Sequence, residues 1–176
     1  MSKNQENKPV ISPASEIEFK IERAFNAPRD LVWKAHSEAD HLKHWWGPKG
    51  CTVSVKLFEF RPGGLFHYGM HYSTGSAMWG RFFYREIEAN KRIVWLNSFA
   101  TETGGIARAP FSQDCPLEMH NVMTLTEHNG KTTLTLRSTP FGANAQECKF
   151  FADLHGSMQQ GFGGTYDQLS AYLAKL

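Results

Sequence analysis

The feature that most constrains the fold is a change in the spacing of apolar residues at about residue 143. Before that point, apolar and polar residues alternate with a period of two, which is typical of strands with one face in water. After it, apolar residues recur at steps of three and four, as on one face of a long helix. The stripe comprises Phe151, Leu154, Met158, Phe162, Thr165, Leu169, Tyr172 and Leu176. A sheet followed by one long amphipathic helix predicts an α+β fold in which each element covers the other.

Seven segments read as strands, and two short helices are expected between the first and the second. The expected strands are 16–25, 52–60, 65–72, 76–88, 92–101, 117–127 and 131–139. Pro28 can occupy the first position of a helix, and Gly47-Pro48 would end the second helix. Asn129-Gly130 is the strongest hairpin signal in the chain. We therefore predict a curved antiparallel sheet of six to seven strands, wrapped around the C-terminal helix.

The length of 176 residues suits one domain. Residues 1–14 are polar and lack any apolar period, so we predict a disordered tail followed by a single domain over 15–176. Residues 102–116 are rich in Gly, Pro, Ala and Ser, and a loop of that length suggests a functional rim.

Composition narrows the partners and the compartment. The net charge is only +2 and the basic residues are scattered, so we expect no nucleic acid among the partners. The start of the chain lacks the apolar core of a signal peptide, and no apolar run approaches the roughly 20 residues of a membrane span. Three distant cysteines imply no disulfide framework and favour a cytoplasmic location. No nucleotide-binding or nucleophile motif is present, so we expect no cofactor.

Strand parity indicates which side chains would face the helix. The expected pocket residues are Phe66, Tyr68, Met70, Trp95, Asn97, Phe99, Asn121, Met123, Phe151, His155, Met158 and Phe162. Such a set makes either a filled core or the wall of a cavity. The two asparagines would either pair with backbone, a loop or each other, or anchor a ligand. His155, at the edge of the stripe, is either a packed side chain or an acid/base.

Two further features leave alternatives open. Gly161, Gly163 and Gly164 lie inside the predicted helix, where they indicate either close packing on the sheet or a thin section beside a cavity. His41 and His44 are three residues apart on one helix, but no third ligand with fixed spacing joins them, so we expect no metal site. His67 and His71 fall on the face opposite the aromatic residues and are expected to face solvent.

Five runs form a recognisable set: FNAPRDLVW from Phe25, HLKHWWGP from His41, RPGG from Arg61, GKTTLTL from Gly130 and GSMQQGFGGTYDQL from Gly156. Together they resemble the family of activators of a heat-shock ATPase, within the START-like, birch-pollen-allergen-like (SRPBCC) superfamily. The resemblance covers about residues 16–176. It implies the helix-grip fold of that superfamily, with a cavity between sheet and helix.

Three functions follow from the residues and the resemblance together. The first is binding of a small hydrophobic or amphipathic ligand, without catalysis, in the cavity. The second, implied by the family's co-chaperones, is a protein-interaction module that stimulates a heat-shock chaperone. The third is a cyclase or hydratase, as in some superfamily relatives, which would draw on His155, Asn97 and Asn121. The oligomeric state stays open between a monomer and a homodimer.

Overall fold

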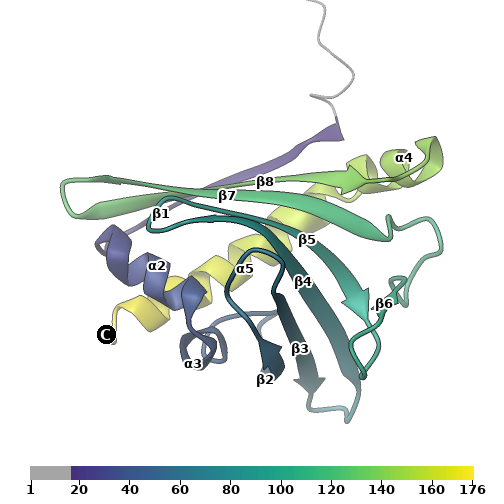
Figure 1. Cartoon of the computed structure of the whole chain (residues 1–176), viewed down its shortest axis with the longest axis horizontal. Helices are drawn as coiled ribbons and strands as arrows, with labels where there is room; N and C mark the ends of the chain where they lie inside the picture. Colours follow the sequence, from purple (N-terminus) through teal and green to yellow (C-terminus); the bar gives the residue numbers. More distant parts are fainter. Residues whose placement is uncertain (1–16) are drawn as a thin grey trace, which may run out of the picture.

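The computed structural model describes residues 17–176 (Figure 1). The predicted tail, 1–14, lies outside the described residues. The strands are β1 (Phe19–Phe25), β2 (Cys51–Phe58), β3 (Leu65–Tyr72), β4 (Ala77–Glu88), β5 (Arg92–Ala100), β6 (Ile106–Ala107), β7 (Glu118–His128) and β8 (Lys131–Phe141). The helices are α2 (Arg29–Ser37), α3 (Ala39–Leu42), α4 (Ala145–Asp153) and α5 (His155–Leu173).

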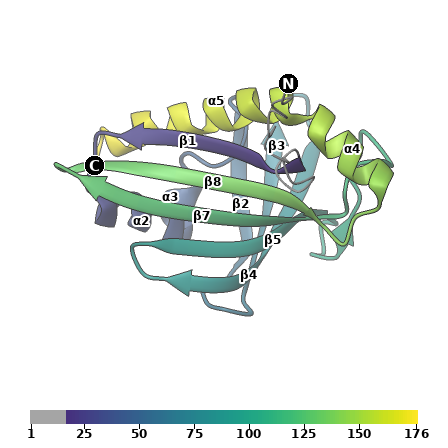
Figure 2. The same ribbon diagram turned by 90° about the horizontal axis from the view of Figure 1, so that it is seen from above.

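The strands form one antiparallel sheet in the order β1-β8-β7-β5-β4-β3-β2, and the short β6 pairs with β5. The first two strands of the chain therefore lie at opposite edges, and the sheet does not close. Irregular pairing at Val55/Leu57 and Tyr84/Glu86 interrupts the ladders, and such bulges bend a sheet. Figures 1 and 2 show the resulting curvature, with β3 and β4 turned steeply away from β7 and β8. The predicted α+β architecture is confirmed.

The turn between β7 and β8 has the backbone conformation that Asn129-Gly130 predicts. Asn129 and Gly130 have φ values of 49° and 73°. Two successive positive φ angles are what a two-residue hairpin requires, and Asn-Gly adopts them at little cost. The turn fixes the register of β7 on β8, with His128 opposite Lys131.

The C-terminal helix runs along the inner side of the curved sheet (Figures 1 and 2). It is not continuous from residue 143, because a tight turn at Leu154 separates α4 from α5. The amide of Leu154 donates to the carbonyls of both Phe150 and Phe151 at 3.1 Å. Asn144 begins α4 with a reciprocal capping box to Glu147, which satisfies two of the free amides at the helix start.

The helices α2 and α3 lie against one end of the core. Trp45 is 1% exposed, and its indole N–H donates to the carbonyl of Ala35 at 3.0 Å. The fully buried Phe25, Leu134 and Leu169 come from β1, β8 and α5. The sheet, α2, α3 and α5 therefore share one core. Side chains do not fill this core completely, and the cavity that remains is the candidate site.

Candidate functional site

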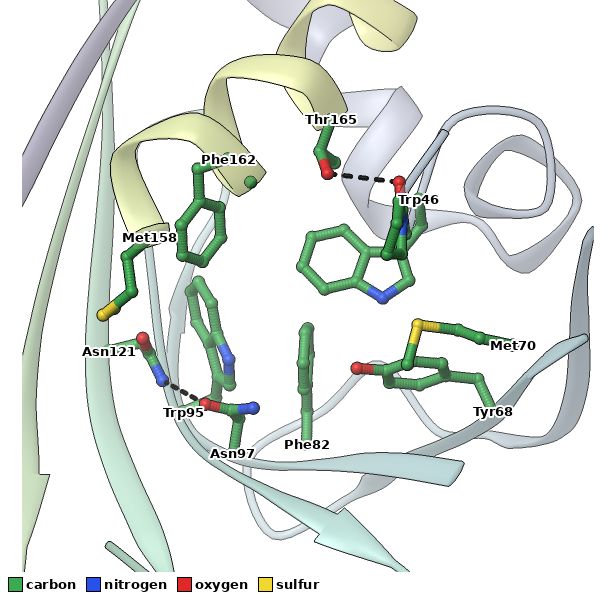
Figure 3. A pocket seen from close by; sticks show the side chains of 13 residues that line it. Trp46, Tyr68, Met70, Phe82, Trp95, Asn97, Asn121, Met158, Phe162 and Thr165 are labelled. Atoms are coloured by element: carbon green, nitrogen blue, oxygen red, sulfur yellow. Dashed lines mark hydrogen bonds between the residues drawn. The ribbon is translucent and has the colours of Figure 1, made fainter. Parts of the chain in front are cut away.

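A partly open cavity of about 220 Å³ lies between the concave face of the sheet and α5 (Figure 3). One side is closed by the segment that follows α3. The lining residues are Trp46, Gly47, Pro48, Tyr68, Met70, Phe82, Trp95, Asn97, Asn121, Met158, Gly161, Phe162 and Thr165. Strands β3 and β5 each contribute two side chains two positions apart, because the side chains of a strand alternate between its two faces, and β4 and β7 contribute one each.

Aromatic rings form most of the wall. Trp46 stands edge-on to Phe82, with ring centroids 5.3 Å apart, and Phe82 stacks on Trp95 at 5.1 Å. Tyr68 lies over Gly80, where an added Cβ would sit 2.5 Å from the tyrosine hydroxyl. Glycine at position 80 therefore sets how far the Tyr68 ring can withdraw from the cavity.

The segment after α3 is tied to α5 by its backbone. The carbonyl of Gly47 accepts hydrogen bonds from the Thr165 hydroxyl at 3.1 Å and from the Gln168 side-chain amide at 2.7 Å. Gly47 has a φ of +91°, a conformation that side chains disfavour. Gly47 therefore makes the turn that places Trp46 beside the cavity and holds it against the helix.

Two asparagines and a serine form a buried polar chain at the β5 side of the cavity. Ser138 on β8 donates to Asn121 Oδ1. Asn121 Nδ2 donates to the carbonyl of Met119 at 3.0 Å and to Asn97 Oδ1 at 3.2 Å. Asn121 and Ser138 are 3% and 2% exposed. Both asparagines line the cavity, but Asn121 is satisfied by backbone and neighbours, whereas the side-chain nitrogen of Asn97 makes no hydrogen bond in the described structure.

The cavity is electrically neutral. Among residues 17–176, the lining contains no Asp, Glu, Lys, Arg or His. Burial raises the pKa of Tyr68 to about 12, so its hydroxyl stays protonated near neutral pH. The buried indole nitrogen of Trp95 has no hydrogen-bond partner within the described part of the chain, whereas the indole N–H of Trp46 faces the Tyr68 hydroxyl, whose pKa it lowers against the larger effect of burial. Both indole N–H groups beside the cavity are hydrogen-bond donors.

Seven of the twelve expected pocket residues line this cavity. They are Tyr68, Met70, Trp95, Asn97, Asn121, Met158 and Phe162. Met123 lines a smaller neighbouring void of about 30 Å³, which shares Trp95 and Phe162 with the main cavity. Phe66 and Phe151 are fully buried in the core, away from the lining.

The other two expected residues lie elsewhere. Phe99 contacts Phe111 of the loop, with ring centroids 5.7 Å apart. His155 packs between Phe19 and Phe151, and its Nε2 lies 3.2 Å from the carbonyl of Ile17. The structure thus gives His155 the role of a packed side chain.

The structure also places His67 and the loop 102–116 differently from what the sequence indicated. His67 is 7% exposed, so the expectation that it faces solvent is wrong: the turn after β5 covers it, and its ring bonds the carbonyl of Thr101 at 3.1 Å. The loop 102–116 contains β6 and is held by Arg108, which donates to Gln113, Cys115 and Glu147. In the described structure no residue of that loop lines the cavity.

Five lining residues were not expected from the sequence, namely Trp46, Gly47, Pro48, Phe82 and Thr165, and Gly161 was expected there only as one of two alternatives. Two signals could have found some of them. Phe82 has the same strand parity as Tyr84, and Thr165 belongs to the apolar stripe. Trp46 had no such signal, because its neighbour Trp45 fills the core and only the tertiary arrangement separates the two roles.

The glycines of α5 are not explained by close packing. A Cβ added at Gly161, Gly163 or Gly164 would meet no atom of the described structure within 4 Å, leaving aside the helix's own nearby backbone. Gly161 lines the cavity. Gly161 therefore thins the helix beside the cavity, whereas Gly163 and Gly164 are not part of the lining.

Over residues 17–176, no group of three or more His, Cys, Asp or Glu side chains is placed to hold a metal ion. The three cysteines are free thiols. Among the described helices, none has the length and apolarity to cross a membrane.

A curved antiparallel sheet that encloses a C-terminal helix, with a cavity between them, defines the helix-grip class of proteins. Within that class, the chain belongs to the family described as Activator of Hsp90 ATPase homolog 1-like protein, which matches residues 26–174. No curated protein matches the chain.

Solved structures agree on the fold. A protein from Arthrobacter aurescens is 25% identical with a TM-score of 0.77, over 94% of this chain and 91% of its own. A protein from Mycobacterium smegmatis is 22% identical with a TM-score of 0.73, over 92% and 93%. A protein from Nitrosomonas europaea is 24% identical with a TM-score of 0.70, over 96% and 99%. The matches extend over nearly the whole of each chain.

Proposed function

We propose that the protein binds a small hydrophobic or amphipathic molecule in the cavity between the sheet and α5. The observation that carries the proposal is the cavity of about 220 Å³ lined by aromatic and methionine side chains. Most protein interiors leave few voids larger than a water molecule. An apolar cavity of about 150 Å³ admits benzene, so this one suits a bicyclic aromatic compound or a chain of similar bulk.

The size of the void also predicts a measurable effect on stability. Cavities in protein cores cost about 24 cal/mol per Å³, which for this volume gives at most about 5 kcal/mol. A ligand that restores the missing contacts would recover part of that free energy. Binding is therefore expected to raise the melting temperature in proportion to how well the ligand fills the cavity.

The test uses naphthalene-sized probes, with thermal shift and tryptophan fluorescence as readouts, because Trp46 and Trp95 both line the cavity. Gly161→Leu should weaken or abolish binding, because Gly161 lines the cavity on α5 and a leucine added there meets open space rather than packed atoms. Gly156→Leu is the matched control, because Gly156 is on the same helix, is equally unhindered and does not line the cavity. Unchanged binding by Gly161→Leu would contradict the proposal.

A protein-interaction role is a second candidate, and exposed aromatic residues favour it. Phe111 in the loop is 61% exposed and Phe141 at the end of β8 is 43% exposed. Exposed apolar side chains mark a contact surface where they form a contiguous patch. Stimulation of a purified heat-shock ATPase, lost in Phe111→Ser but retained in Gly161→Leu, would support this function over ligand binding.

The geometry gives less support to the cyclase or hydratase hypothesis. Asn97 and Asn121 are at the cavity, but His155, the acid/base named for that reaction, packs against Phe19 and Phe151 instead. A general base must reach the substrate within hydrogen-bond distance. We therefore propose binding rather than proton transfer for this site.

A further inference from the structure

We propose that the ligand carries an uncharged oxygen acceptor, of the carbonyl type, which bonds to the side-chain amide of Asn97. This inference rests on the proposed binding function and names the chemical class that the cavity would select. It follows from the orientation of one amide, from the kind of polar groups that surround the cavity, and from the absence of charge among the lining residues.

The orientation of Asn97 is fixed by the polar chain behind it. The carbonyl of Met119 can only accept, so the Asn121 atom that lies 3.0 Å from it must be the amide nitrogen. The same nitrogen donates to Asn97 at 3.2 Å, so the Asn97 atom facing it must be the oxygen. Ser138 supports this arrangement by donating to the oxygen of Asn121.

The nitrogen of Asn97 is therefore the part left for a ligand. In the described structure no hydrogen bond is made by Asn97 Nδ2, although the residue lines the cavity, and Figure 3 shows the nitrogen directed away from Asn121. An amide nitrogen has two N–H donors and accepts nothing. A bound molecule thus gains at this position only if it presents an acceptor.

The surroundings of Asn97 disfavour a charged group on the ligand at this position. A carboxylate or ammonium buried without a counter-charge loses its hydration with little in return. Among the described residues, the lining offers no ionised partner. The indole N–H groups of Trp46 and Trp95 add donor dipoles beside the cavity, and these dipoles favour an oxygen over a second donor nearby. A ketone, aldehyde, ester or amide on an apolar ring meets these conditions.

The aromatic part of such a ligand has its own place. Phe82 and Trp95 flank Asn97, and Trp46 stands across from it on the side of Thr165 (Figure 3). An aromatic ring packed among them would leave an attached carbonyl within reach of β5. The polar chain and the aromatic wall together would orient the ligand, with its oxygen toward β5 and its ring toward α5.

The experiment compares 2-acetylnaphthalene with 2-isopropenylnaphthalene, which replaces the carbonyl oxygen by a CH₂ group of similar shape. Kd is measured by tryptophan fluorescence for the wild type and for Asn97→Leu. We expect the wild type to prefer the ketone about five- to tenfold, the factor that one net hydrogen bond supplies. Asn97→Leu should lose that preference while still binding the hydrocarbon, which shows that the variant retains its cavity.

Several results would contradict the inference. Equal affinity of the wild type for both probes, or an unchanged preference in Asn97→Leu, overturns the inference and leaves the binding function standing. Tighter binding of 2-naphthoate than of the ketone overturns it as well, because the group would then be an anion. If neither neutral probe binds to the wild type, both this inference and the proposed function fail.

Discussion

Replacing the glycines of α5 by alanine tests whether this helix is thin because of close packing or because of the cavity. The change is the triple variant Gly161→Ala, Gly163→Ala and Gly164→Ala. Each added methyl group has no described atom within 4 Å outside the helix's own nearby backbone, so no clash opposes it. Alanine exceeds glycine in helix propensity by up to about 1 kcal/mol per position. We therefore expect the free energy of unfolding to rise by about 2–3 kcal/mol.

The assay is urea denaturation followed by circular dichroism, together with a thermal scan. For a chain of this size, each kcal/mol raises the melting temperature by about 2–4 °C, so the triple variant should melt about 5–10 °C higher. Gly47→Ala is the control with the opposite sign. Its φ is +91° and its added Cβ would lie 3.1 Å from the sulfur of Cys51, so it should lose stability. A destabilised triple variant would refute the cavity interpretation and show that the helix needs glycine to approach the sheet.

Three further predictions concern single residues. Gly80→Ala should push the ring of Tyr68 toward the cavity, lowering the free energy of unfolding by about 1–3 kcal/mol in urea and weakening probe binding. Burial lowers the pKa of His36 from 6.5 to about 4, so between these pH values the unfolded chain binds more protons than the folded protein. The free energy of unfolding should therefore fall as the pH drops from about 6.5 to 4. In urea titrations, His36→Gln should flatten that pH dependence. Arg108→Ala removes the bonds that hold the loop 102–116 to Glu147, and limited proteolysis should then cut this loop faster than in the wild type, with equal rates contradicting the role assigned to Arg108.

Much of the fold follows from local patterns in the sequence. Asn129-Gly130 specifies its hairpin because both residues accept positive φ angles, and that turn sets the register of β7 and β8. Alternation places Trp95 and Asn97 on one face of β5, and both line the cavity. The apolar stripe predicts the helix that covers them. These features depend on neighbours within a few residues, so the chain alone determines them.

Other features depend on how distant elements meet. Trp45 and Trp46 are adjacent, yet one fills the core and the other lines the cavity. His67 has the parity of an outward-facing residue, and the turn around Thr101 buries it. The break at Leu154 is hidden within a continuous apolar stripe. None of these outcomes changes the local pattern, so periodicity could not reveal them.

The cavity itself is the clearest case. The same aromatic and methionine residues could have made a solid core, and the sequence left both outcomes open. The sheet and α5 enclose a certain space, and the side chains that they carry fill most of it. The cavity of 220 Å³ is the small difference between these two much larger volumes. Sequence determined which side chains face inward, whereas the curvature of the sheet and the position of α5 decided that they do not fill the space between.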